Sequence, residues 1–332
     1  MPDLKHWVIG GTTYDIVDET AREGAMYALL VVNTGKEGAE VSAVNGNLMA
    51  SGTTGNDGTV TLAIPSSGTY TVSATLNGAT FSNAIAVTEK NKTYLVNVEG
   101  INIVSFSSGT DEEIGQMIDY AHAHPNFKLS DYWAVGDTRT IHVNKFNYLS
   151  GNSMSALAAQ DGIIAITSFD EYNSCGNVLQ FDFTKFGMYT QAFNQNSYYS
   201  NCNLYYTSLP NMANALPDAI KSRLLTFDCE STYYTDAFNA KTAANNKLAI
   251  RSTYEVFGTA AYSIEGGKQL DYYKTTSNRI KHYKSGNAIQ WWLRSGTNNG
   301  ANTTDRDYVK SDGTYAYTNY DIPYAIFPFG CL

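Results

Sequence analysis

The chain has 332 residues, of which 43% are hydrophobic, 13% are aromatic and only 16% are charged. Soluble domains usually carry about 25% charged residues, so this chain is poor in charge. Its net charge of −9 argues against sequence-independent binding to nucleic acid and against attraction to anionic lipid, because both need a basic surface. No apolar run reaches the roughly 20 residues that span a bilayer, and residues 1–11 lack the apolar stretch of a secretory signal. We therefore expect neither nucleic acid as a partner nor insertion into a membrane.

Residues 1–25 form a short mixed segment that is too small to fold alone. It contains the stretch Tyr14–Arg22, with the sequence YDIVDETAR. One interpretation is a flexible tail. The other is a peptide that attaches the chain to a larger assembly or drives oligomerisation, and a resemblance given below favours this second interpretation.

Residues 26–104 have the pattern of a purely β structure. Apolar and polar residues alternate at 60–64 and at 70–76, as expected when one face of each strand is buried. Turn signals lie at 55–58 and at Asn77–Gly78. Short strands at this spacing predict a small Ig-like β-sandwich. Because this stretch contains no His and no Cys, we interpret it as a spacer.

A helix is predicted directly after the spacer. Thr110 and Glu113 have the spacing of a capping box, and apolar residues at 114, 117, 118 and 121 form one stripe on a helix. His122 and His124 follow near the end of this helix. Their spacing places them on different faces, so we expect surface residues there and not a metal site.

The rest of the chain alternates between strand and helix patterns. The isoleucines at 163–166 indicate a strand, Pro210 and Pro217 can each begin a short helix, and 322–329 is an apolar run suited to a buried final strand. The sequence therefore predicts an α+β domain over residues 105–332.

The four cysteines lack the spacing of a zinc site, since no CxxC pair occurs. We expect buried thiols, with one disulfide that involves Cys331 as the alternative. No metal ligands and no cofactor are predicted. A structural calcium site remains an alternative, because Asp and Asn are abundant although no EF-hand pattern is present.

Five stretches in the third zone resemble, in order, a domain common in Firmicutes prophages and in surface proteins of gut bacteria. These stretches are YWAVGDTR at 132–139, the two LP-led helices at 208–221, TYEVFG at 253–258, QLDYY at 269–273 and WWLRS at 291–295. That domain is similar to the C-type-lectin-like fold of formylglycine-generating enzymes and of adhesins varied by diversity-generating retroelements. The resemblance implies such a fold for residues 105–332 and a strand at 253–258. Gly296 departs from the family, which has Pro after WWLRS.

The N-terminal part resembles components of phage tails. The stretch Tyr14–Arg22 is similar to the attachment end of siphophage tail and baseplate proteins, and the β module is similar to their Ig-like inserts. These resemblances imply a homotrimer bound to other tail or baseplate proteins. They also imply a place in the virion, at the tail tip, after synthesis in the host cytoplasm.

The segment at 297–324 has the composition of a binding surface, since 18 of its 28 residues are Asn, Thr, Tyr or Asp. Tyr contributes a large amphipathic ring at small entropic cost, and short polar side chains supply adaptable hydrogen bonds. In the C-type-lectin-like fold that the resemblance implies, this segment faces the ligand, and retroelement-diversified proteins concentrate their variation there. A solvated β-hairpin with an aromatic ladder is the alternative. The predicted ligand-binding residues are Asn298, Asn299, Asn302, Thr304, Asp305, Arg306, Asp307, Tyr308, Tyr315, Tyr317, Asn319 and Tyr320.

A second cluster of aromatic and Asn residues, at 172–206, could border the same surface. Trp291 and Trp292 are expected to anchor the core, on opposite faces of one strand. No triad motif and no GxSxG occurs, so we predict no catalytic residues. The sequence thus predicts a non-catalytic phage tail adhesin that binds a glycan or protein on a bacterial surface. The alternatives are an adhesin or lectin of the bacterial cell surface, and a tail-associated glycan hydrolase or formylglycine-generating-type enzyme.

Overall fold

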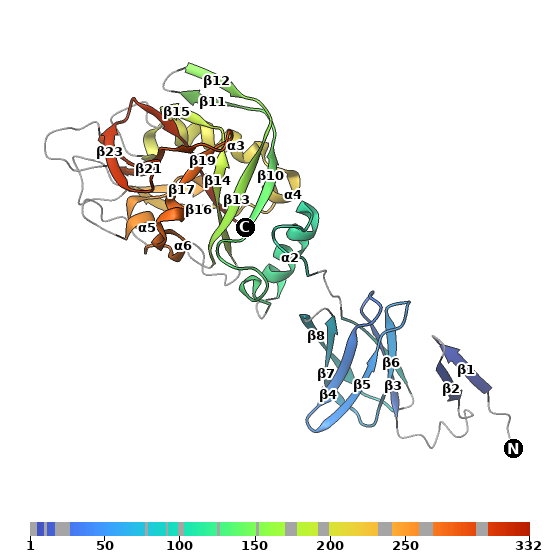
Figure 1. The fold of residues 1–332 in the computed structure, drawn as a ribbon. Helices are drawn as coiled ribbons and strands as arrows, with labels where there is room; N and C mark the ends of the chain where they lie inside the picture. Colours follow the sequence, from blue (N-terminus) through green and yellow to red (C-terminus); the bar gives the residue numbers. More distant parts are fainter. Residues whose placement is uncertain are drawn as a thin grey trace. The chain divides into compact units, whose positions relative to one another are not determined.

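A computed structural model describes most of the chain. The described residues are 27–76, 79–90, 92–98, 103–124, 127–150, 153–169, 178–191, 199–231, 241–258, 268–296 and 305–332, together with the backbone of strands at 5–9 and 12–16. The chain divides into two compact units, Met1–Ile103 and Val104–Leu332 (Figure 1). This division lies next to the boundary expected between residues 104 and 105.

The N-terminal segment contains one antiparallel pair of strands, β1 (Lys5–Ile9) and β2 (Thr12–Ile16). The side chains of residues 1–26 lie outside the described part of the chain. The attachment or oligomerisation role of residues 1–25 stays a prediction.

The rest of the first unit consists of a three-stranded and a four-stranded sheet, with the strand orders β6-β3-β9 and β5-β4-β7-β8. Their strands are β3 (Ala28–Asn33), β4 (Glu40–Asn45), β5 (Leu48–Thr53), β6 (Thr59–Ile64), β7 (Gly68–Leu76), β8 (Ala79–Val87) and β9 (Thr93–Asn97). The alternation at 60–64 and 70–76 is confirmed, because Leu62, Tyr70 and Val72 are buried while their neighbours face outward.

The second unit is built on two larger sheets. The first contains β10 (Thr138–Val143), β13 (Gln160–Phe169), β14 (Leu179–Phe186), β18 (Leu248–Ala249), β19 (Lys281–Tyr283), β20 (Ala288–Ile289) and β25 (Phe329–Cys331). The second has the order β15-β24-β21-β22-β23, with β15 (Tyr189–Gln191), β21 (Trp291–Gly296), β22 (Asp305–Val309), β23 (Tyr315–Asn319) and β24 (Pro323–Ala325). Two small antiparallel pairs are β11 (Phe146–Ser150) with β12 (Ser153–Leu157), and β16 (Phe227–Ser231) with β17 (Lys241–Asn246).

The helices of the second unit are short, apart from α2 (Asp111–Ala123). They are α3 (Leu209–Ala215), α4 (Asp218–Lys221), α5 (Thr253–Phe257), α6 (Asp271–Lys274) and α7 (Thr276–Arg279), with a π-helical turn, η3, at Leu204–Ser208. None of the described helices is long and apolar enough to cross a membrane.

The expectation of an α+β fold with a C-type-lectin-like domain is wrong, because the structure is mainly β and is divided into many small sheets. Helices end early for local reasons. Pro217 lies directly before α4, and a proline inside a helix removes a hydrogen bond, so α3 and α4 cannot merge. The helix signals in the amino-acid sequence predicted more helical content than these short helices provide.

The TYEVFG stretch, expected to be a strand, is the helix α5. The Ser252 side chain accepts a hydrogen bond from the Glu255 N–H, and the Glu255 side chain accepts one from the Ser252 N–H, which completes a capping box. Gly258 then ends the helix with a φ of 70°, a left-handed conformation that favours glycine. The final apolar run is also divided, because β24 belongs to the second of the two larger sheets and β25 to the first.

The capping box predicted for α2 is confirmed. The Thr110 side chain accepts from the Glu113 N–H at 3.2 Å, and the Glu113 side chain accepts from the Thr110 N–H at 2.9 Å. Trp133 and Arg139, both from the YWAVGDTR stretch, contact the segment before α2 and α2 itself, respectively. The Trp133 indole donates to the Val104 carbonyl at 2.8 Å, and the Arg139 guanidinium pairs with Asp111.

Replacing Thr110 by Ala removes this cap and should lower the free energy of unfolding by about 1 kcal/mol. Urea denaturation of the full chain measures the change. Thr110→Ser is the matched control, because it retains the hydroxyl and should be close to wild type. Equal stability of the Ala and Ser variants would show that the cap does not stabilise the helix.

Candidate functional site

The predicted tyrosine-rich surface centres on a hairpin of β22 and β23. The Lys310 N–H donates to the Thr314 carbonyl at 2.8 Å, and the Gly313 N–H donates to the Lys310 carbonyl at 2.9 Å. Gly313 has a φ of 82°, and a Cβ at this position would lie 2.8 Å from the Thr276 carbonyl oxygen. The turn therefore requires glycine for its conformation and for its space.

The structure divides the predicted ligand-binding residues into three groups. Four of them, Asn298, Asn299, Asn302 and Thr304, lie outside the described residues. Three are buried, namely Asp305, Arg306 and Asp307. The remaining five reach the surface at least in part, namely Tyr308, Tyr315, Tyr317, Asn319 and Tyr320.

Asp305, Arg306 and Asp307 therefore do not lie on the exposed binding surface that the composition predicted. They lie on β22, which is an inner strand between β21 and β23, so neighbouring strands and α5 cover it. The Asp307 carboxylate accepts hydrogen bonds from the Thr253 hydroxyl at 2.5 Å and from the Tyr315 hydroxyl at 3.0 Å. Alanine at these three positions would disturb the fold, so these residues cannot serve to test binding.

The alternation of β-strands places the aromatic residues of this segment on two faces. On one face, the Tyr315 ring lies 5.7 Å from that of Phe257 and 6.5 Å from that of Tyr317, measured between centroids. On the other face, the Tyr324 ring lies 4.6 Å from that of Tyr308 and 5.0 Å from that of Trp292. The segment thus forms two aromatic clusters.

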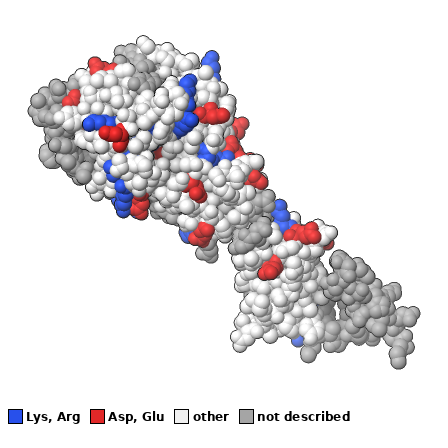
Figure 2. Space-filling view, viewed as in Figure 1, with Lys and Arg blue, Asp and Glu red and all other residues white. Residues whose placement is uncertain are grey.

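The first face is the more accessible. Tyr317 is 44% exposed, and Phe257 and Tyr315 are half-buried. The Arg279 guanidinium lies over the Phe257 ring, 4.7 Å from its centroid. Figure 2 shows that, on the face of the molecule drawn there, charged side chains occur in small separate groups within a largely uncharged surface. We name the group Phe257, Tyr315 and Tyr317 the tyrosine ladder.

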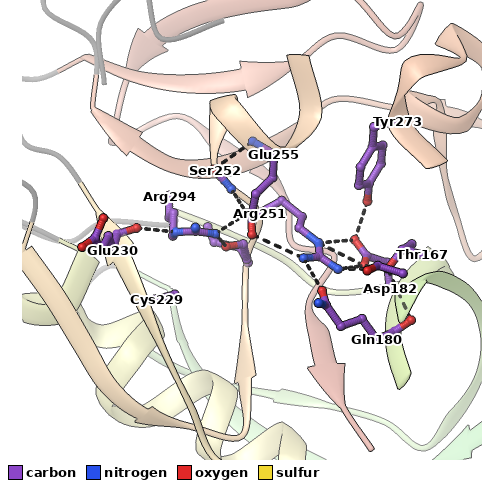
Figure 3. Close-up of polar contacts among 12 residues, drawn as sticks. Thr167, Gln180, Asp182, Cys229, Glu230, Arg251, Ser252, Glu255, Tyr273 and Arg294 are labelled. Carbon is purple, nitrogen blue, oxygen red and sulfur yellow. Dashed lines mark hydrogen bonds and ion pairs between the residues drawn. The ribbon is translucent and has the colours of Figure 1, made fainter. Parts of the chain in front are cut away.

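The second unit also contains a network of buried charges that the sequence did not reveal (Figure 3). The Asp182 carboxylate on β14 accepts hydrogen bonds from Arg251 at 2.5 and 3.1 Å, and also from the Tyr273 hydroxyl. Thr167 donates to the same carboxylate at 2.8 Å. Gln180 accepts from Arg251 at 2.9 Å. All five side chains are buried, so the network joins β13, β14, α6 and the segment before α5 inside the unit.

The second half of the network is built around Glu255. Its carboxylate accepts from Arg294 at 2.6 Å and pairs with Arg251 at 3.4 Å. Arg294 also donates to the backbone carbonyls of Ile250 and Glu230, at 2.8 and 2.6 Å. Each guanidinium therefore has several acceptors, which is the condition under which a buried charge is tolerated.

Lys281 completes the network from β19. Its ammonium lies 3.3 Å from the Asp182 carboxylate and 4.2 Å from the centroid of the Trp291 ring, with the rings of Tyr273 and Phe327 at 5.6 and 5.4 Å. Aromatic faces attract a desolvated cation, so these rings compensate part of the lost hydration.

The shifts in pKa follow from this arrangement. Burial alone would raise the pKa of Asp182, but Arg251 and Lys281 outweigh it and lower that pKa from 3.8 to about 2. Burial lowers the pKa of Lys281 from 10.5 to about 8, although Asp182 opposes that shift. Burial raises the pKa of the Tyr273 hydroxyl well above 10, and the Asp182 charge adds to this shift.

Three of the five stretches that carry the family resemblance converge on this network. TYEVFG supplies Glu255, WWLRS supplies Arg294, and QLDYY supplies Tyr273. Ser295, the last residue of WWLRS, accepts a hydrogen bond from the Thr253 N–H at 2.8 Å. These motif residues hold the unit together from inside, which is a structural role and not a ligand-binding one.

The other predicted features have mixed outcomes. Tyr206 of the second aromatic cluster is 64% exposed and lies on the π-helical turn, next to the Tyr205 ring.

Cys202, Cys229 and Cys331 are buried thiols, so Cys331 is not in a disulfide. Burial raises the pKa of Cys202 to about 11 and that of Cys331 to about 12, which makes both poor nucleophiles at neutral pH. The fourth cysteine, Cys175, lies outside the described residues.

Among the described residues, no group of three or more His, Cys, Asp or Glu side chains is arranged to hold a metal ion. His122 and His124 are exposed near the end of α2, and the ring of His124 stacks on that of Tyr120 at 3.8 Å. Trp291 and Trp292 are both buried and contact different aromatic groups, as expected for neighbouring residues of one strand.

Comparison with protein families gives a match over part of the chain. Residues 177–332 match a protein family described as a domain of unknown function (DUF6273). The matched range contains both aromatic clusters and every residue of the buried network except Thr167, and it excludes α2 and the first unit. A search among curated proteins finds no match to the chain.

Asp182→Asn should lower the free energy of unfolding by about 3–5 kcal/mol at neutral pH, because it leaves buried cations without their main counter-charge. The depressed pKa means that the stability from Asp182 is present above about pH 4 and is lost as the pH falls toward 2. The difference between variant and wild type should therefore shrink over that range. Asp161→Asn is the control, since Asp161 pairs with His142 on the surface. Similar effects of both substitutions in urea denaturation would contradict this account.

Lys281→Met should change how stability depends on pH at the alkaline end. From about pH 8 to 10.5 the folded chain has lost the Lys281 proton while the unfolded chain retains it, so the contribution of Lys281 to stability rises with pH. The wild type should therefore gain stability relative to the Met variant over this range in denaturation curves. Lys274→Met, at an exposed lysine, should show no such trend. A parallel course of wild type and Lys281→Met would contradict the shift.

Proposed function

We propose that this chain is a non-catalytic adhesin of a phage or prophage tail, and that its tyrosine ladder binds a glycan or protein on a bacterial surface. The observation that carries the proposal is the ladder itself, in which an exposed Tyr317 adjoins half-buried aromatic rings on an outer strand. Tyr rings supply contact area with few rotatable bonds, and they bind both sugar faces and protein surfaces.

The rigidity of the support favours a binding role. Asp307 accepts hydrogen bonds from Thr253 and from the Tyr315 hydroxyl, so the ladder is tied to α5. The helix α5 is tied in turn to the buried network through Glu255. A surface held in this way loses little conformational entropy when it binds, which strengthens binding without further contacts.

The position of the reactive groups also favours binding over catalysis. The carboxylates of Asp182, Glu255 and Asp307 are buried and take part in ion pairs or hydrogen bonds inside the fold. The Cys202 and Cys331 thiols are buried with raised pKa values. These groups stabilise the unit, and their burial separates them from a substrate in solution.

The resemblances in the sequence support a location for this binding at a phage tail. Residues 1–25 would attach the chain to the tail or baseplate or join three copies, and the β-sandwich would act as a spacer. The chain would be part of the virion at the tail tip. Several copies on one particle would raise the avidity of a weak single site. Variation by a diversity-generating retroelement would act on the segment at 297–324.

Tyr317→Ala should weaken binding to cells and purified envelopes from a panel of Firmicutes by roughly tenfold or more, since central aromatic residues often contribute 2 kcal/mol or more. Sedimentation of labelled protein with envelopes measures the affinity. Tyr27→Ala is the matched control, because Tyr27 is 52% exposed and lies in the other unit. Unchanged affinity of Tyr317→Ala on every strain that binds the wild type would overturn the proposed site. Release of soluble envelope fragments by the protein would overturn the non-catalytic role.

A further inference from the structure

The strand β23 ends the order of its five-stranded sheet. Its partner is β22, and no other described strand pairs with it. A strand in this position presents backbone N–H and C=O groups on its outer side. Figure 1 shows β23 at one margin of the second unit.

The hairpin turn defines which backbone groups face outward. Because the Lys310 N–H donates to the Thr314 carbonyl, these two residues form a hydrogen-bonded pair. Bonded and non-bonded pairs alternate along an antiparallel ladder, so the pair of Asp307 and Tyr317 is a non-bonded one. The N–H and C=O of Tyr317 therefore point away from β22. No described residue makes a backbone hydrogen bond to them.

The sequence of β23 lacks the features that usually protect an outer strand. Its five residues, YAYTN, include no charged residue and no Pro. The other strands that end the two larger sheets differ, whereas β11 and β12 of a small two-stranded sheet share this uncharged composition. The strand β10 carries Arg139 and His142, β15 has three residues and β20 has two. In the described part of this unit, β23 is thus an uncharged outer strand of sufficient length to accept another strand.

The side chains beside this edge suit an extended polypeptide. Tyr315 and Tyr317 project to the same face with Phe257, since residues two apart on a strand share a face. An added strand would make main-chain hydrogen bonds to Tyr317, and every second side chain would pack on the ladder. This is the recognition mode in which the backbone supplies affinity and alternate side chains supply specificity.

Charge argues against a second copy of the chain as the occupant. The exposed Asp312 and Asp321 flank β23. Antiparallel pairing of two copies about Tyr317 would bring Asp312 of one copy beside Asp321 of the other, at both ends of the pair. Like charges across strands are destabilising, and each copy also has a net charge of −9. A neutral or basic strand avoids this repulsion.

We propose that the outer edge of β23 binds an extended, neutral or basic polypeptide segment of a bacterial surface protein by strand addition. The inference rests on the proposed function and narrows the receptor from glycan or protein to protein. It assigns the N–H and C=O of Tyr317 as the main-chain contacts and the tyrosine ladder as the side-chain contact.

The test compares Tyr317→Pro with Tyr317→Ala. Both variants lack the ring, but only proline also lacks the outward N–H, and an outer, non-bonded position tolerates proline. The probes are Firmicutes envelopes, with and without proteinase treatment, and short linear peptides displayed on beads. We expect Tyr317→Pro to bind roughly fivefold or more weakly than Tyr317→Ala, the effect of one main-chain hydrogen bond. Unchanged thermal melting of both variants shows that the fold is intact.

Selected peptides provide a measurement that does not depend on the protein variants. Methylation of the peptide backbone nitrogens, one at a time, should abolish binding at alternate positions, because only every second N–H of an added strand faces β23. Proteinase treatment of the envelopes should also abolish binding.

The outcomes separate this inference from the proposed function. If Tyr317→Ala weakens binding, Tyr317→Pro equals it and proteinase has no effect, the ligand is a glycan and the strand-addition inference is wrong. If neither variant weakens binding, the proposed site is also wrong. If the protein forms a dimer that Tyr317→Pro disrupts, a second copy occupies the edge and the inference is overturned.

Discussion

The architecture of the second unit depends on the ion pair between Asp182 and Arg251. Both side chains are fully buried, and the cost of removing two charges from water is repaid only because each has several partners of good geometry. Such a pair adds less to stability than its Coulomb energy suggests. It does specify one arrangement, since any other register of β14 against its neighbours would leave a charge unsatisfied.

This constraint explains how a unit of many small sheets can present a defined surface. Short helices and strands of three to five residues have little cooperative stability of their own. The buried network connects them through side chains, from Thr167 on β13 to Arg294 on β21. The aromatic residues of β22 and β23 are therefore displayed on an internally cross-linked support.

Local patterns in the sequence predicted local structure well. The capping box at Thr110, the alternation at 60–64 and the strand at 163–166 depend on neighbouring residues, and the structure contains each of them. The strand expected at 253–258 failed for a local reason, since a capping box at Ser252 and the left-handed Gly258 define a single helical turn. Ser252 and Glu255 have the spacing of a capping box, so the sequence itself carries this helix signal.

Long-range features could not be predicted from composition. Asp305 and Asp307 resemble surface residues in a segment rich in Asn and Tyr, yet the position of β22 inside a sheet buries them. The mainly β architecture likewise depends on strand pairing over long separations and not on the count of helix signals. The motif residues were visible in order, but their meeting in space requires the register of several strands. In the sequence these residues only mark a resemblance to a family, whereas in the structure they are components of the core.

Cys202, Cys229 and Cys331 are buried as thiols, and this burial protects them from oxidation. Solvent oxidants reach an enclosed sulfur slowly, and a thiol with a raised pKa supplies little of the thiolate that reacts with them. At these positions the chain needs no oxidative maturation after synthesis. These three thiols can therefore pass unchanged from a reducing into an aerobic environment.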